Sequence, residues 1–222
     1  LTASGNTSPS YFQQEVNYKI NVRLNDKKQS LHADIEIEYI NRSSDTLNEL
    51  FFHLWPNAYK NRNSALCKQL LESGDATLYF ADEKERGFID SLQFTADDEI
   101  ISWKPDQVHE DICLLQLKKP LLPGNKVIIR TPFYVKLPSA SFSRLGHLGQ
   151  AYAITQWYPK PAVYDNQGWH AMPYLTLGEF YSEYGSFEVN ITLPKNYVVG
   201  ATGDLQTPSE IEWMNNKSKE QV

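Results

Sequence analysis

The chain has 222 residues, of which 41% are hydrophobic and 22% charged, a composition typical of a folded protein and not of a disordered one. Its 21 Lys and Arg against 27 Asp and Glu give a net charge of −6, which argues against a nucleic-acid partner. No apolar run approaches the roughly 18 residues that span a bilayer, so no transmembrane segment is predicted. Cys67 and Cys113 are too few for a disulfide scaffold; they are expected as two buried thiols or, in an oxidising compartment, one disulfide.

The two ends of the chain are polar. Residues 1–10 are expected to be a disordered or trimmed tail, and residues 215–222 a frayed or truncated end. The first residue is Leu1 and not Met, as in a mature chain after removal of a signal or lipoprotein leader, although a chain shortened for expression begins in the same way. The first of these interpretations predicts a secreted, periplasmic or outer-envelope protein.

Alternating apolar and polar residues predict most of the strands. The alternation runs over 16–24 and again over 31–39, with a turn between, which indicates an antiparallel hairpin with one solvated face. Further strands or apolar runs are predicted at 50–55, 87–94, 100–103, 112–117, 127–135, 187–193 and 211–213. Pro132 indicates that the strand at 127–135 is an edge strand or is bent.

One short helix is predicted at 64–72, where Leu66, Leu70 and Leu71 recur at helical spacing before Ser73-Gly74. The sequence therefore predicts a single all-β domain over 11–214, built as a sandwich or as an open, curved and mostly antiparallel sheet system.

The segment 138–184 is long, irregular and aromatic, and loops of this length are uncommon unless they are functional. It does not complete a catalytic set. The chain has five His but no pair four residues apart, so it lacks the helix motif of a zinc peptidase. It also lacks a Gly-x-Ser-x-Gly elbow and a phosphate-binding glycine loop. No metal site, catalytic residue or cofactor is predicted in this chain.

Within and around this segment several short motifs occur in register. They are TQWYPKPAVY at 155–164, GWH at 168–170, GEFYSEYG at 178–185 and PKNYVVGATG at 194–203, preceded by WPNAY at 55–59 and PLLPG at 120–124. Together they resemble the N-terminal domain of the aminopeptidase N family of gluzincin zinc metallopeptidases, and most closely its secreted or envelope members from Bacteroidetes-type bacteria. The resemblance spans about 11–205.

This resemblance implies a β "saddle" that precedes a catalytic domain. In the family, that second domain supplies a zinc-binding His-Glu-x-x-His helix and a Gly-x-Met-x-Asn loop, and neither motif is present here. The chain is therefore expected to be inactive alone. Its expected partners are its own C-terminal catalytic domain, which would hold the zinc, and a peptide substrate.

The resemblance also implies a contact with substrate. In the family, a loop reading Gln-x-Glu or Gln-x-Gln helps to hold the free amine of the peptide, because an ammonium group requires acceptors. Here Gln156 stands at the first position and Tyr158 at the second, where a phenol brings no charge. We predict that Gln156, Trp157 and Tyr158 bind substrate, with amine anchoring weakened by Tyr158. The alternatives are a Gln156 amide bonded to backbone and a hydrophobic cluster under the loop.

The leading functional hypothesis is a non-catalytic substrate-cleft and scaffolding domain of a zinc metallopeptidase, an aminopeptidase that cleaves N-terminal residues from peptides. A second hypothesis is a carbohydrate-binding β-sandwich in which Trp157, Tyr158, Tyr164 and Trp169 stack on sugars, favoured by a flat row of aromatics on one sheet face. A third is a structural adhesion or assembly module with a large exposed apolar patch.

Overall fold

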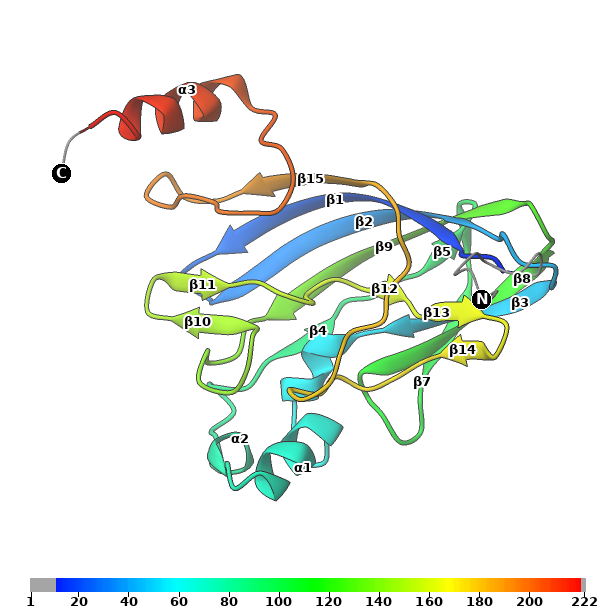
Figure 1. The fold of residues 1–222 in the computed structure, drawn as a ribbon. Coiled ribbons are helices and arrows are strands. Elements are labelled where there is room, and N and C mark those ends of the chain that lie inside the picture. Colours follow the sequence, from blue (N-terminus) through cyan, green and yellow to red (C-terminus); the bar gives the residue numbers. More distant parts are fainter. Residues whose placement is uncertain (1–10, 221–222) are drawn as a thin grey trace, which may run out of the picture.

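A computed structural model describes residues 11–220, and most of its regular structure is strand (Figure 1). The long strands are β1 (Glu15–Asn25), β2 (Ser30–Ile40), β3 (Leu47–His53), β8 (Ile112–Leu121), β9 (Lys126–Lys136) and β15 (Phe187–Thr192). The short strands are β4 (Phe88–Asp90), β5 (Thr95–Ala96), β6 (Glu99–Ile100), β7 (Ser102–Pro105), β10 (Gly146–Leu148), β11 (Ala151–Ala153), β12 (Lys160–Pro161), β13 (Val163–Asp165) and β14 (Gly168–His170). The predicted all-β class is confirmed.

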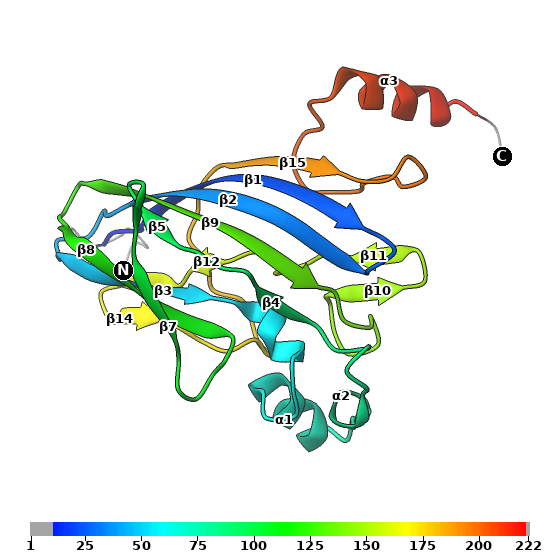
Figure 2. The same ribbon diagram turned by 180° about the vertical axis from the view of Figure 1, so that it is seen from behind.

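The largest sheet has the strand order β15-β1-β2-β9-β5-β6, with β4 also paired to β9. β1 and β2 form the predicted hairpin and pair along their whole length, from Glu15 opposite Ile40 to Asn25 opposite Ser30. β15 is the exception to the antiparallel pattern, because it pairs parallel to β1. Figure 1 and Figure 2 show β1, β2 and β9 as long, curved neighbours, in agreement with a curved and mostly antiparallel sheet.

A second sheet has the order β12-β3-β8-β7. The apolar faces of both sheets contribute to one core, in which Ile37 and Ile129 of the first sheet and Leu50, Phe52 and Leu115 of the second are almost completely buried. Each such side chain stabilises the fold by roughly 1.5–3 kcal/mol relative to an exposed one. In β1 and β2 the buried apolar residues alternate with polar residues that face solvent. This alternation explains why both strands could be predicted from the sequence.

The helix predicted at 64–72 is confirmed as α1 (Ala65–Glu72). Its N-cap is Ser64, whose hydroxyl accepts a hydrogen bond from the backbone N–H of Cys67 at 3.2 Å. Two further short elements precede and follow it, the 3-10 helix η1 (Trp55–Tyr59) and α2 (Thr77–Phe80). Cys67 and Cys113 are both buried and unbonded, as the first alternative expected.

Of the two alternatives for the strand at 127–135, an edge strand or a bent one, the edge position is wrong. β9 pairs with β2 on one side and with β4 and β5 on the other. Pro132 is tolerated because the second neighbour of β9 is interrupted there: the pairing with β4 ends at Tyr134, and the pairing with β5 begins only at Arg130. Between these points the backbone N–H of Gln93 donates to the hydroxyl of Thr131 at 2.8 Å.

The strand predicted at 211–213 is also wrong, because these residues lie in α3 (Pro208–Lys217). Pro208 at the first turn, Glu210 near the N-terminus and Lys217 in the last turn favour a helix. All of its side chains are solvent-exposed or nearly so, and both ribbon views show α3 beyond β15 and apart from the two sheets (Figure 1, Figure 2). The tail predicted for residues 1–10 lies outside the described residues, as do residues 221–222 of the predicted C-terminal end.

No helix among residues 11–220 is long and apolar enough to cross a bilayer.

Candidate functional site

The long segment 138–184 is ordered by contacts with the rest of the domain. It contains the hairpins β10–β11 and β13–β14, and β12 adds to the edge of the second sheet beside β3. Its later part is held by two hydrogen bonds. The indole Nε1 of Trp55 donates to the carbonyl of Met172 at 3.1 Å, and the backbone N–H of Tyr174 donates to the carboxylate of Asp111 at 2.6 Å. The segment therefore has a fixed path over the domain.

Gln156 lies between β11 and β12 with a φ of 53°, in the left-handed region that a non-glycine residue rarely adopts. Its side-chain oxygen Oε1 accepts a hydrogen bond from Nζ of Lys160 at 3.2 Å. The alternative expectation, an amide bonded to backbone, is therefore replaced by a side-chain contact. Strained backbone of this kind persists only where the surrounding structure holds it, and it is common at functional sites.

Lys160 in β12 is only 4% exposed, which is unusual for a lysine without a carboxylate partner. Its ammonium donates to Gln156 Oε1 and, at 2.5 Å, to the hydroxyl of Ser182, and it lies 4.0 Å from the ring centroid of Trp55. No ion pair involves Lys160 among residues 11–220. Burial lowers the pKa of Lys160 to about 7.

Little in the amino-acid sequence pointed to Lys160 and Ser182. Lys160 stands between Pro159 and Pro161 inside the TQWYPKPAVY motif, and that position was the only available signal. Ser182 is 22 positions further along the chain, in the segment that runs toward β15. Neither residue was among the predicted site residues.

The base of the Lys160 environment is aromatic and uncharged. Trp55 stacks on His53 with a centroid distance of 4.5 Å, and Phe180 packs on Trp55 at 4.8 Å. Nε2 of His53 accepts from the backbone N–H of Met172 at 3.2 Å, which places the proton of a neutral ring on Nδ1. Burial, with a smaller effect of the Lys160 charge, lowers the pKa of His53 to about 3, so His53 is neutral at physiological pH.

Trp157 and Tyr158 turn toward the core. The ring of Trp157 lies 5.8 Å from that of Phe133 in β9, and the ring of Tyr158 meets Tyr18 in β1 edge-on at 5.6 Å. Burial raises the pKa of Tyr158 to about 12, so its phenol carries no charge at neutral pH. Both side chains are half-buried, as expected for a hydrophobic cluster under the loop, and their contact with substrate stays a prediction.

A second polar group lies on the adjoining hairpin. Nε2 of His170 is 2.8 Å from Oδ1 of Asp165, an ion pair when the histidine is protonated, and the Tyr181 hydroxyl donates to Asp165 at 3.4 Å. Burial raises the pKa of Glu183 to about 7. These residues order the segment that also carries Ser182.

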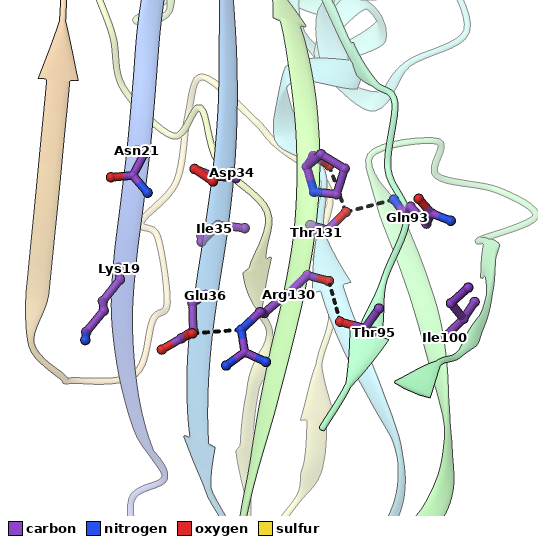
Figure 3. A pocket seen from close by; sticks show the side chains of 11 residues that line it. Lys19, Asn21, Asp34, Ile35, Glu36, Gln93, Thr95, Ile100, Arg130 and Thr131 are labelled. Atoms are coloured by element: carbon purple, nitrogen blue, oxygen red, sulfur yellow. Dashed lines mark hydrogen bonds and ion pairs between the residues drawn. The ribbon is translucent and has the colours of Figure 1, made fainter. Parts of the chain in front are cut away.

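A groove of about 590 Å³ lies on the other face of the large sheet (Figure 3). Its lining includes Arg130, which pairs with Glu36 at 2.7 Å. Lys19, Asn21 and Asp34 complete its polar side. A flat row of aromatic side chains would favour the carbohydrate hypothesis, and no aromatic residue among residues 11–220 lines this groove.

Among known proteins, no family model and no curated protein sequence matches this chain. Solved structures do match it. A mutant M1 zinc metallopeptidase from Deinococcus radiodurans has a TM-score of 0.51 at 13% identity, and the match covers 88% of this chain. The fold is one found in M1 zinc metallopeptidases. The mutant of the same organism bound to a Tyr-Ser-Ala substrate gives 0.50 at 13%, and a two-domain M1 mutant bound to L-arginine gives 0.50 at 14%, again over 88% of this chain.

The chain spans 36% of the length of each of these M1 metallopeptidases. The resemblance that the sequence motifs indicated is thus confirmed as a likeness of fold. At 13–14% identity the M1 likeness does not assign a role to any single side chain.

The M1 structures are named as zinc metallopeptidases. The described part of this chain has no cluster of side chains that could bind zinc. Among residues 11–220 no three His, Cys, Asp or Glu side chains gather as metal ligands would. No step through zinc is therefore derived from these residues.

Proposed function

We propose that this chain is the non-catalytic substrate-cleft and scaffolding domain of a zinc metallopeptidase, and that it works with a catalytic domain of the same protein. Two findings support the proposal. The chain shares its fold with M1 zinc metallopeptidases over 88% of its length, while spanning 36% of theirs. In addition, several short motifs in register resemble the N-terminal domain of the aminopeptidase N family.

The observation that carries the proposal is the way Gln156 is held. Its motif resembles the loop with which the family contacts substrate. Its backbone is in the left-handed region, and a buried lysine bonds its side chain. A solvated loop amide needs none of these features. A side chain that must present one orientation to a ligand benefits from all three, because preorganisation lowers the entropy lost on binding.

In this proposal the zinc of the catalytic domain supplies water activation and carbonyl polarisation. The residues of this chain bind and orient the peptide. Gln156 would offer a hydrogen bond to the peptide, while Trp157 and Tyr158 would contribute apolar surface beside it. Holding a substrate in the reactive geometry accounts for a large part of the rate of many enzymes.

Peptides are the proposed substrate class, and removal of N-terminal residues is the activity that the family resemblance implies. The two acceptors that would anchor a free amine are weakened here. Tyr158 replaces the second acceptor with an uncharged phenol, and Lys160 occupies the Gln156 oxygen. A secreted, periplasmic or outer-envelope location is proposed from the resemblance of the motifs to those of secreted or envelope members of the family.

The carbohydrate-binding alternative has less support. Trp157, Tyr158, Tyr164 and Trp169 are half-buried and pack against the core instead of forming an open row. For example, Trp169 lies 5.8 Å from Phe51 and 5.0 Å from Tyr164.

The proposal is tested on the protein that the complete gene encodes. We expect bound zinc, and peptide cleavage that a chelator abolishes. Gln156→Ala should lower kcat/KM by about tenfold, the effect of one lost hydrogen bond to a charged or strongly polar group. Gln167→Ala, at an exposed glutamine of the nearby hairpin, is the matched control and should leave kcat/KM unchanged. A zinc-free protein, or cleavage that continues with chelator present, would rule out the proposed function.

A further inference from the structure

We infer that Lys160 fixes the Gln156 amide so that its NH2 group faces the substrate. Gln156 therefore recognises a carbonyl oxygen of the peptide in preference to a free N-terminal amine. The inference rests on the proposed function, which it deepens. It makes Lys160 a positioning residue and Gln156 a specificity-determining one.

The orientation of the amide follows from the chemistry of lysine. The two ends of a glutamine side chain are often hard to distinguish, and the hydrogen-bond network must decide between them. In its protonated form, below about pH 7, Lys160 is an ammonium group with three donors and no acceptor, so only the oxygen of Gln156 can face it at 3.2 Å. The amide nitrogen Nε2 then points away from Lys160.

Lys160 cannot easily turn aside to release the amide. Its ammonium is enclosed by three contacts: Gln156 Oε1, the Ser182 hydroxyl at 2.5 Å and the face of Trp55 at 4.0 Å. These account for its three donors. Its backbone is fixed as well, because Lys160 pairs with His53 across β12 and β3.

The nitrogen of Gln156 is available to a ligand. Within residues 11–220 it has no hydrogen-bond partner, and it is not one of the buried unpartnered atoms. An amide NH2 group offers two donors, which match a carbonyl oxygen and do not match an ammonium group.

The local charge also disfavours an amine. A protonated amine beside Gln156 would approach the Lys160 ammonium, which lies directly behind the amide oxygen. While Lys160 is protonated, the two positive charges repel each other, and no carboxylate pairs with Lys160 in the described part of the chain to offset the repulsion. Tyr158, at the second motif position, is a neutral phenol.

The test compares one fluorogenic peptide made in two forms, with a free and with an acetylated N-terminus, cleaved by the protein of the complete gene at about pH 6, where Lys160 is protonated. The measured quantity is the ratio of kcat/KM for the acetylated form to that for the free form. We expect a ratio of one or more for the wild type. Gln156→Glu keeps an oxygen for Lys160 and turns the other toward the substrate, so it should lower the ratio at least about tenfold.

Lys160→Met keeps the length of the side chain and removes its donors, which lets the amide of Gln156 turn over. It should lower the ratio in the same direction by a few-fold, mainly through KM. Gln167→Glu and Lys104→Met, both at exposed positions, are the matched controls and should not change the ratio. A merely structural role for Lys160 would lower both rates together and leave their ratio unchanged.

The outcomes are distinguishable. If the wild type cleaves both forms only with zinc but prefers the free amine, and neither substitution changes that preference, the inference is wrong while the proposed function stands. If the wild type shows no zinc-dependent cleavage of either form, the proposed function is wrong, and the inference with it. Should Lys160→Met not fold, Gln156→Glu decides, because it leaves Lys160 and its three contacts in place.

Discussion

Lys160 is unusual for a lysine because it is almost completely buried without a carboxylate partner in the described part of the chain. Lysines are almost never fully buried without a carboxylate partner, because the charged form is costly away from water. Here a hydroxyl, an amide oxygen and an indole face replace the carboxylate. Each of these contacts is weaker than an ion pair, so the site leaves the lysine with a lowered pKa, near 7.

The lowered pKa of Lys160 predicts a pH dependence of stability. Between about pH 7 and its ordinary pKa of 10.5, the unfolded chain binds a proton at Lys160 that the folded chain does not. The free energy of unfolding therefore rises as the pH rises from about 7 toward 10.5, and it falls again as the pH returns toward 7. From about pH 7 to pH 9 the wild type should gain roughly 1–2 kcal/mol relative to Lys160→Met, measured by urea unfolding.

The same experiment has a clear negative result. If the wild type and Lys160→Met change in parallel over this pH range, Lys160 titrates in the folded protein as it does in water. Its burial among Gln156, Ser182 and Trp55 would then not hold in solution.

The left-handed backbone of Gln156 predicts an unusual ranking of substitutions. Gln156→Ala and Gln156→Gly both remove the amide, but only glycine adopts a φ of 53° without strain. The glycine variant should be more stable than the alanine variant by about 1 kcal/mol in thermal or urea unfolding. At Gln167, an exposed turn residue whose φ is not positive, the order should be reversed or absent. An alanine variant as stable as the glycine variant would show that the loop relaxes.

At the scale of elements, the backbones of β1 and of the segment leading into β15 are closely packed. The backbone N–H of Val16 donates to the carbonyl of Tyr184 at 3.1 Å, and that of Tyr18 donates to Ser186 at 2.8 Å. Gly185 lies between these two bonds, and a Cβ there would overlap the backbone oxygen of Val16. The segment that carries Ser182 is thereby tied to the large sheet.

Gly185→Ala should therefore separate β15 from β1. We expect a loss of about 1–3 kcal/mol in the free energy of unfolding, the range for overpacked sites, and faster amide hydrogen exchange at Val16 and Tyr18. Gly200→Ala is the control, because a Cβ at Gly200 meets nothing within 4 Å. Equal stability and equal exchange in the two variants would contradict the close packing at Gly185.

Element prediction from the sequence worked where one face of a strand is solvated. β1 and β2 have this property, so their alternation fixed both the strands and the pairing. It failed at 211–213, because the same three residues suit a strand or a helix and the exposed α3 has no sheet partner to decide between them. The place of β9 was misjudged because a proline signals a missing neighbour, and the sequence does not show that the neighbour is missing only at Pro132.

At the scale of the whole molecule, the fold could be predicted further than the site. Motifs in chain order pointed to a fold that the M1 structures share. They also singled out Gln156, which lies in the loop between β11 and β12. They could not show Lys160 as its partner, because that contact depends on burial. The enclosure of Lys160 also combines Trp55 from the 3-10 helix with Ser182 from the approach to β15, which lie 127 positions apart by the difference of their numbers. Such a site is formed by topology and leaves no local pattern in the sequence.

The central claim is that this domain touches the peptide through Gln156. The most direct measurement is a crystal structure of the protein of the complete gene, with zinc, in complex with an N-acetylated peptide. The account predicts a carbonyl oxygen of the peptide within hydrogen-bond distance of Gln156 Nε2, while Oε1 remains on Lys160. A peptide bound at the zinc with no contact to Gln156, or with an amine placed against its oxygen, would contradict the account.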